Sequence, residues 1–140
     1  MDNENSAEAD VVEIGDDDYL IRKIPEIPHM QAGNGGKRRI SKSAFSASSA
    51  AVDPEEGMST NSQALLEAEG VDLDTFAPEF PALARLRVSD VRALGLTVVH
   101  RQMPGDYSHC QVLGVKSSHR KKLLQMSLPV RKPDDVDWGT

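Results

Sequence analysis

The most regular pattern of apolar and polar positions lies in the last third of the chain. Two runs rich in apolar and β-branched residues, 96–103 and 108–113, flank Pro104 and Gly105. Proline fixes φ and glycine tolerates positive φ, so this pair suits the centre of a turn. The pattern predicts an antiparallel hairpin over about 96–113. Apolar residues on both faces at its far end indicate burial on both sides.

The register of this hairpin decides where its two histidines point. If the loop consists of residues 104–105, or of residues 104–107, His100 and His109 share one face. A loop of odd length places them on opposite faces, because side chains alternate with a period of two. The two even loops predict a polar groove in which both imidazoles lie.

Shorter signals predict the other elements. The run 19–24 is typical of a strand, and a helix capped by Ser117 or Ser118 is expected to reach about Gln125. Thr60 with Gln63 has the form of a capping box, which predicts a helix ending at Gly70.

Residues 81–94 fit two structures. We prefer one helix over this range, ending at Gly95, with apolar residues on one side; a short strand over 83–88 is the alternative. The preceding loop, 71–81, is acidic and is interrupted by two prolines. Three of its apolar side chains are expected to turn inward: Leu73, Phe76 and Phe80.

Together these elements predict a small single domain of the α+β class, with the hairpin, a few short helices and disordered acidic termini. A length of 140 residues allows one domain of ordinary size. We expect a disordered segment over 1–18, with a short partner-binding stretch at 11–14, then a folded domain over 19–133. An acidic tail, 134–140, contains Trp138, which could dock on a partner or on its own domain.

Charge is distributed in blocks along the chain. The net charge is −6, but residues 83–132 carry ten bases and two acids, whereas residues 1–18 and 51–82 each carry eight acids and no base. Blocks of one sign steer partners more than an even mixture does. The acidic blocks could equally lie against the basic ones within the molecule.

The basic block suggests a binding surface. Its members in and around the last predicted helix, with one in the hairpin, are Arg101, Lys116, His119, Arg120, Lys121 and Lys122. Cations at a helix start oppose the helix dipole, so an anionic partner would give them a function. The negative total and the 4% aromatic content favour a protein partner, with nucleic acid possible.

Two side-chain groups could instead carry chemistry. His100 and His109 could act as general acid and base on a phosphate ester, as in a small nuclease or phosphotransferase. No metal-binding spacing of histidines is present, and no glycine-rich motif cradles a nucleotide, so we expect no metal and no cofactor. Cys110 adjoins His109 in the predicted strand and therefore points to the other face, as a small buried side chain.

Arg22 and Cys110 complete the expectations. Arg22 is interpreted as a solvent-facing charge on an edge strand. A single cysteine cannot form an internal disulfide and fits a reducing compartment, and the chain has neither a long apolar span nor the start of a secretory signal. We therefore expect a cytoplasmic, non-enzymatic accessory protein without membrane contact. The phosphoester-acting enzyme is the alternative.

Overall fold

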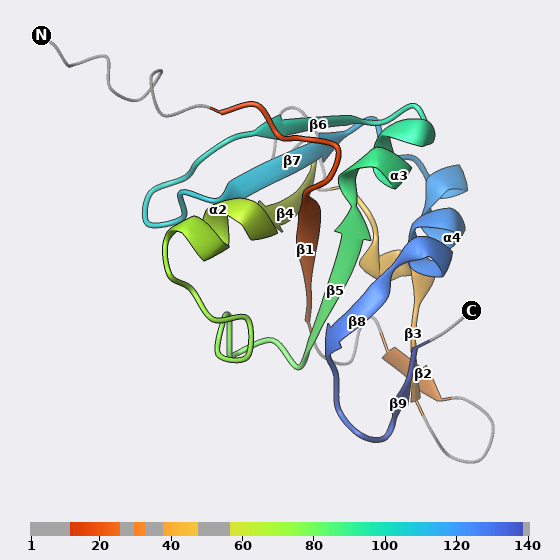
Figure 1. Ribbon diagram of the computed structural model, residues 1–140. Helices are drawn as coiled ribbons and strands as arrows, with labels where there is room; N and C mark the ends of the chain where they lie inside the picture. The colour runs from red at the N-terminus through yellow and green to blue at the C-terminus, as the bar shows by residue number, and fades with distance from the viewer. Residues whose placement is uncertain (1–11, 26–29, 33–37, 48–56, 139–140) are drawn as a thin grey trace, which may run out of the picture.

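The computed structural model describes residues 12–25, 30–32, 38–47 and 57–138. Its main element is a six-stranded antiparallel sheet in the order β6-β7-β4-β1-β5-β8 (Figure 1). The strands are β1 Tyr19–Ile24, β4 Met58–Ser62, β5 Ala82–Arg87, β6 Thr97–His100, β7 His109–Leu113 and β8 Leu128–Arg131. A smaller sheet contains β2 Met30–Ala32, β3 Arg38–Ile40 and β9 Val136–Asp137, with β3 and β9 parallel.

Short helices connect or cover these strands. They are α2 Gln63–Ala68, α3 Val88–Ala93, α4 Ser117–Met126 and the 3-10 turn η2 Lys42–Ala44. One antiparallel sheet with a few short helices confirms the predicted α+β class. Within the described part of the chain, no helix is long and apolar enough to cross a membrane.

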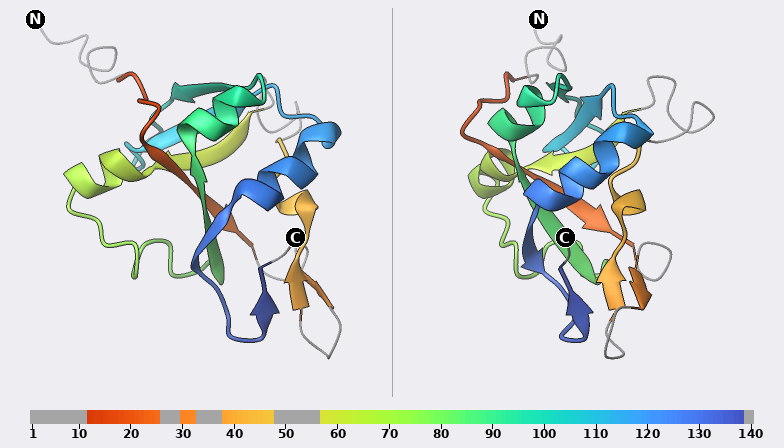
Figure 2. Two further views of the ribbon diagram at one scale, coloured as in Figure 1. Left: turned by 45° about the vertical axis from the view of Figure 1, so that its right-hand side comes forward. Right: turned by 90° about the vertical axis from the view of Figure 1, so that its right-hand side faces the viewer.

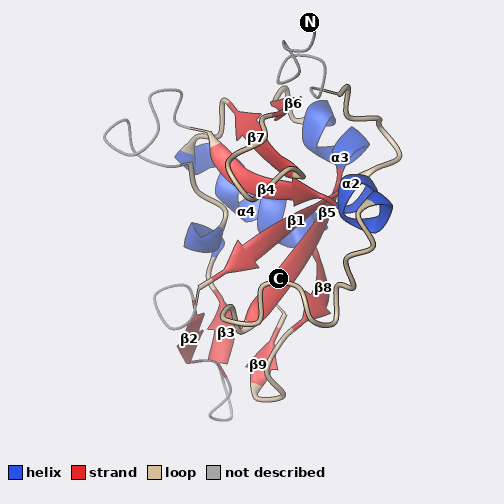
Figure 3. Cartoon of the chain, turned by 90° about the vertical axis from the view of Figure 1, so that its left-hand side faces the viewer, coloured by secondary structure: helices blue, strands red, loops and turns tan. Residues whose placement is uncertain are grey.

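The main sheet separates two apolar clusters. On one face, α3, α4 and η2 pack over a large cluster that includes Leu20, Leu86 and Val112 (Figure 2). On the opposite face, Ile21 and Leu83 pack against α2 and the loop that follows it (Figure 3). β1 is buried on both faces because Leu20 and Ile21 alternate between the two clusters, which is why this apolar run forms a central strand.

Three predicted elements are confirmed. β1 spans the predicted residues, the hairpin consists of β6 and β7, and α4 follows Gly114 as expected. The predicted cap of α4 is wrong, because Lys116 and not Ser117 or Ser118 occupies the N-cap position. Gly114 and Gly105 adopt φ of 93° and 73°, a region that favours glycine, and each precedes or forms a change of chain direction. The last turn of the hairpin contains only residues 104–105, because Met103 bridges Asp106.

The helix predicted from Thr60 begins later. Residues 58–62 form β4, so Thr60 lies in a strand, and Ser62 caps α2 by accepting a hydrogen bond from the Leu65 amide. The prediction of a single helix over 81–94 is wrong as well. β5 occupies 82–87 and only 88–93 is helical, because Ala82, Ala84 and Leu86 alternate into the large cluster beside β1.

Both acidic ends pack more closely than predicted. Residues 1–11 lie outside the described residues, but Ile14 is buried, so the domain begins before the boundary expected at residue 19. At the other end Val136 is fully buried, and the Trp138 indole N–H donates to the Ser127 hydroxyl at 3.0 Å. Trp138 therefore packs on its own domain.

Candidate functional site

The hairpin places its two histidines on opposite faces of the sheet. His100 pairs with Cys110, whereas His109 pairs with Asn61 on the neighbouring strand. Between the Met103–Asp106 bridge and the His100–Cys110 pair, one strand carries two residues and the other three. This extra residue shifts the alternation by one position. The predicted groove shared by both imidazoles is therefore wrong, and they cannot act together as acid and base.

His100 fastens the N-terminal segment to the hairpin. Its Nε2–H donates to the Tyr107 carbonyl at 2.7 Å, and its Nδ1 accepts from the Val12 amide at 3.0 Å. The Tyr107 ring also contacts the imidazole edge to face, with centroids 5.0 Å apart. Both ring nitrogens of His100 therefore have hydrogen-bond partners within the protein, which gives this residue a structural role.

His109 has a different environment, beside Ser59. Its Nδ1 lies 2.7 Å from the Arg101 carbonyl, which only accepts, so Nδ1 carries the proton. The neutral ring then presents the lone pair of Nε2 to the Ser59 hydroxyl, 3.2 Å away. Ser59 was not among the predicted site residues. It was missed because β4 and β7 come together only through sheet pairing.

Four polar side chains form a patch around this pair. Ser59 lies opposite Gln111 and Asn61 opposite His109, so all four project from one face of β4 and β7. We call these residues, Ser59, Asn61, His109 and Gln111, the polar square. Asn61 is fully buried, and its Nδ2 donates to Asp106 at 2.7 Å and to Ser108 at 2.9 Å. Its Oδ1 is buried without a partner among the described residues, an uncommon state for a buried acceptor.

The chain passes closely over the edge of the polar square. Gly57 precedes β4, and a Cβ atom added there would lie 3.0 Å from the Gln111 Cβ. His109 is only 5% exposed, whereas Ser59 is partly exposed. His109 is thus shielded from solvent, whereas Ser59 is only partly covered.

The predicted basic residues are brought together only in part. Lys116, Lys121 and Lys122 are exposed on and before α4, with His119 and Arg120 half-buried beside them. We call these five residues the basic face of α4. The His119 ring accepts the Lys116 amide at 3.0 Å, so its role includes capping the helix. Arg101 directly follows β6, in the connection between β6 and β7, and that connection lies on the other side of the molecule from α4 (Figure 1). Arg101 is therefore not part of the basic face of α4.

Arg22 is not the solvent-facing edge charge that the sequence suggested. It lies on the central strand β1, and its guanidinium donates to the carbonyls of Ala44 at 2.9 Å and Ser59 at 2.7 Å, with a longer contact to Ser46. Burial lowers the pKa of Arg22 to about 10, which still leaves it charged at neutral pH. This cation joins η2 to β1 and β4.

Cys110 is buried and unreactive by environment. Burial raises the pKa of its thiol to about 12, with a smaller contribution from the negative charge of Asp18. Because the thiolate is the reactive form, this residue is a packing residue, as expected.

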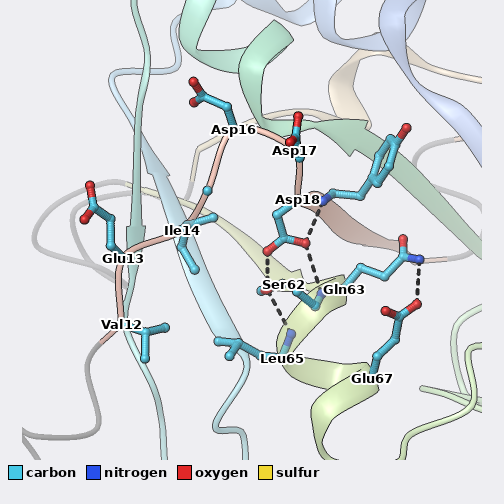
Figure 4. A pocket seen from close by; sticks show the side chains of 13 residues that line it. Val12, Glu13, Ile14, Asp16, Asp17, Asp18, Ser62, Gln63, Leu65 and Glu67 are labelled. Atoms are coloured by element: carbon cyan, nitrogen blue, oxygen red, sulfur yellow. Dashed lines mark hydrogen bonds between the residues drawn. The ribbon is translucent and has the colours of Figure 1, made fainter.

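An acidic cleft of about 610 Å³ lies between the N-terminal segment and the start of α2 (Figure 4). Its carboxylates come from Glu13, Asp16, Asp17, Asp18 and Glu67. Four of them have partners in the domain. Asp16 pairs with Arg92 and Asp17 with Arg87. Asp18 accepts from the Ser62 hydroxyl, and Glu67 accepts from the Gln63 side-chain amide. No group of three or more metal-binding side chains occurs among the described residues.

Comparison of the chain with protein-family models, curated proteins and solved structures gives no match. The function must therefore be argued from the geometry of the basic face and of the polar square.

Proposed function

We propose that this protein is an accessory protein that binds an acidic surface of a protein partner through the basic face of α4. The observation that carries the proposal is the absence of acidic residues from the stretch of sequence that contains these cations. The sequence contains no Asp or Glu between Asp106 and Asp134, a stretch that includes the whole of α4. Lys121 and Lys122 therefore project from a helix with no carboxylate of its own.

The ion pairs of the domain support the same surface. Arg87 and Arg92, which belong to the same basic block, pair with Asp17 and Asp16. The described residues provide no such partner for Lys121 or Lys122. α2, which together with the N-terminal segment lines the acidic cleft, lies on the opposite face of the main sheet from α4 (Figure 3). Charge is thus separated in space, which steers an acidic partner to α4.

A protein partner is favoured over nucleic acid. The whole chain carries a net charge of −6, which repels a polyanion at long range, and only 4% of its residues are aromatic. Both features favour a partner that presents a local acidic patch.

The proposal is tested by fluorescence anisotropy with a labelled ten-residue polyglutamate peptide, at low and at physiological salt. Lys121→Glu/Lys122→Glu is expected to weaken binding by about four-fold or more, because each of four units of charge is worth about 0.2–1 kcal/mol. The matched control is Arg39→Glu/Arg87→Glu, which makes the same change of charge at exposed positions away from α4.

The control variant is expected to bind within about two-fold of the wild type, and salt is expected to weaken the wild-type complex. Equal losses in both variants would show that net charge, not this surface, drives binding. Absence of peptide binding at low salt would refute the proposal. Tighter binding to duplex DNA than to the peptide would replace the protein partner with nucleic acid.

A further inference from the structure

We propose that Ser59 is a nucleophile activated by His109, and that this pair forms a covalent acyl or phosphonyl adduct with esters and related electrophiles. This proposal is independent of the binding function of α4. The hydrogen bonds of His109 define which of its ring nitrogens can act as a base. The Arg101 carbonyl, 2.7 Å from Nδ1, fixes the proton on that nitrogen. A serine hydroxyl 3.2 Å from the other nitrogen then donates toward a base with a free lone pair.

The arrangement has the three parts that an activated serine requires. Ser59 supplies the hydroxyl, His109 accepts its proton, and the Arg101 carbonyl orients the imidazole. A carboxylate usually takes the third position in such sites; a backbone carbonyl holds the ring in the same tautomer without the negative charge. We therefore expect reactivity toward activated electrophiles rather than toward amides.

The strands β4 and β7 hold Ser59 and His109 in fixed positions. Ser59 and His109 lie on paired central strands, and the Arg101 amide donates to the His109 carbonyl at 2.9 Å, which fixes the hairpin beside the ring. Sites built on strands hold their geometry more closely than sites on loops. His109 does not fill an apolar core, because it faces other polar side chains.

One feature of the surroundings indicates a functional site. Asn61, opposite His109, keeps a fully buried carbonyl oxygen that has no donor among the described residues. An unsatisfied buried acceptor of this kind calls for an explanation, and a catalytic role of the neighbouring Ser59–His109 pair provides one.

Acylation of Ser59 requires no reactant besides the ester. The Ser59 oxygen forms a bond to the ester carbonyl carbon while its proton passes to His109 Nε2. The bond to the leaving alkoxide then breaks, and His109 returns the proton to that oxygen. The products are an alcohol and acyl-Ser59, which water hydrolyses. With a fluorophosphonate, the oxygen bonds to phosphorus, and fluoride leaves with the proton.

The test is labelling of the folded full-length protein with a fluorophosphonate probe, followed by peptide mass spectrometry. The expected result is one adduct, on Ser59, that is lost in Ser59→Ala. His109→Gln is expected to slow labelling by about 100-fold, the typical contribution of a positioned general base. Ser118→Ala, which removes an exposed hydroxyl on α4, is expected to label at the wild-type rate.

Two further measurements keep the result decisive. p-Nitrophenyl acetate is expected to release one equivalent of nitrophenolate per chain in an initial burst, and urea-unfolded protein is expected not to label. If Ser59→Ala fails to fold, the adduct position in the wild type still decides. The proposal is overturned if native wild-type protein carries no adduct on Ser59, or if folded His109→Gln labels as fast as the wild type.

Discussion

Arg131 provides the most direct test of how this fold is held together. The residue lies at the end of β8 and donates to carbonyls of the loop between α2 and β5: Phe76 at 2.8 Å, Ala77 at 2.7 Å and Phe80 at 2.9 Å, with longer contacts to Leu73 and Asp74. Ala77 adopts φ of 50°, which a residue with a side chain rarely does. One guanidinium thus holds a strained loop whose apolar side chains cover the second cluster.

Replacement of this guanidinium with an apolar chain should be costly. A hydrogen bond to a charged group contributes about 1.5–3 kcal/mol, but water can satisfy part of the loop when the arginine is absent. We therefore expect Arg131→Met to lower the free energy of unfolding by about 2–4 kcal/mol. Arg131→Lys should recover less than half of this loss, because a single ammonium cannot reproduce the planar fork.

Urea unfolding with a fit of midpoint and slope measures the effect, and limited proteolysis reports the loop itself. Lys132→Met is the matched control. Among the described residues, the Lys132 ammonium donates to the adjacent Pro133 carbonyl at 3.5 Å, so its loss should lower the free energy of unfolding by less than about 0.5 kcal/mol. The reasoning fails if Arg131→Met unfolds within about 0.5 kcal/mol of the wild type and its 72–80 loop is no more sensitive to protease.

Two further predictions concern Cys110 and Asp18. Cys110 should not react with a disulfide reagent at pH 8 in the native protein and should react fully in urea, since its pKa is raised to about 12; rapid native reaction would contradict its burial. As pH rises, the Cys110 thiol ionises in the unfolded chain before it ionises in the folded protein. The stability of the fold should therefore fall as pH rises from the pKa of the unfolded thiol toward 12, and Cys110→Ala should weaken this dependence on pH. Asp18→Ala should lower the free energy of unfolding by about 1–2 kcal/mol, because Asp18 accepts from the Ala64 amide and the Ser62 hydroxyl at the start of α2. Asp74→Ala, in an exposed loop, is the control. Equal losses of stability in the two variants would argue against a capping role for Asp18.

Local signals were sufficient where neighbouring residues decide the structure. The Pro104–Gly105 turn, the apolar run of β1 and the helix after Gly114 each depend on residues within a few positions, and each was predicted. The start of α2 was not, because Thr60 and Ser62 are both acceptable caps. Pairing of Thr60 with Cys110, fifty residues away, keeps Thr60 in a strand and leaves the cap to Ser62.

The polar square illustrates why the site was harder to predict than the fold. Ser59 and Asn61 alternate on one strand, and His109 and Gln111 alternate on another, so each pair of positions indicates a polar face on its own strand. That signal was available in the sequence. The contact between the two strands was not, and neither was the extra residue in the hairpin that turns His109 away from His100.

The positions of the two proposed sites make their tests independent. α4 packs its Leu123 and Leu124 on the same face of the sheet as Cys110, whereas Ser59 and His109 project from the opposite face. Residues separated by a packed sheet and sharing no partner should have additive effects. The α4 variant should therefore label at Ser59 at the wild-type rate, and Ser59→Ala should bind the acidic peptide with unchanged affinity. Loss of both properties in one folded variant would mean that a single surface serves both, which the strand register does not allow.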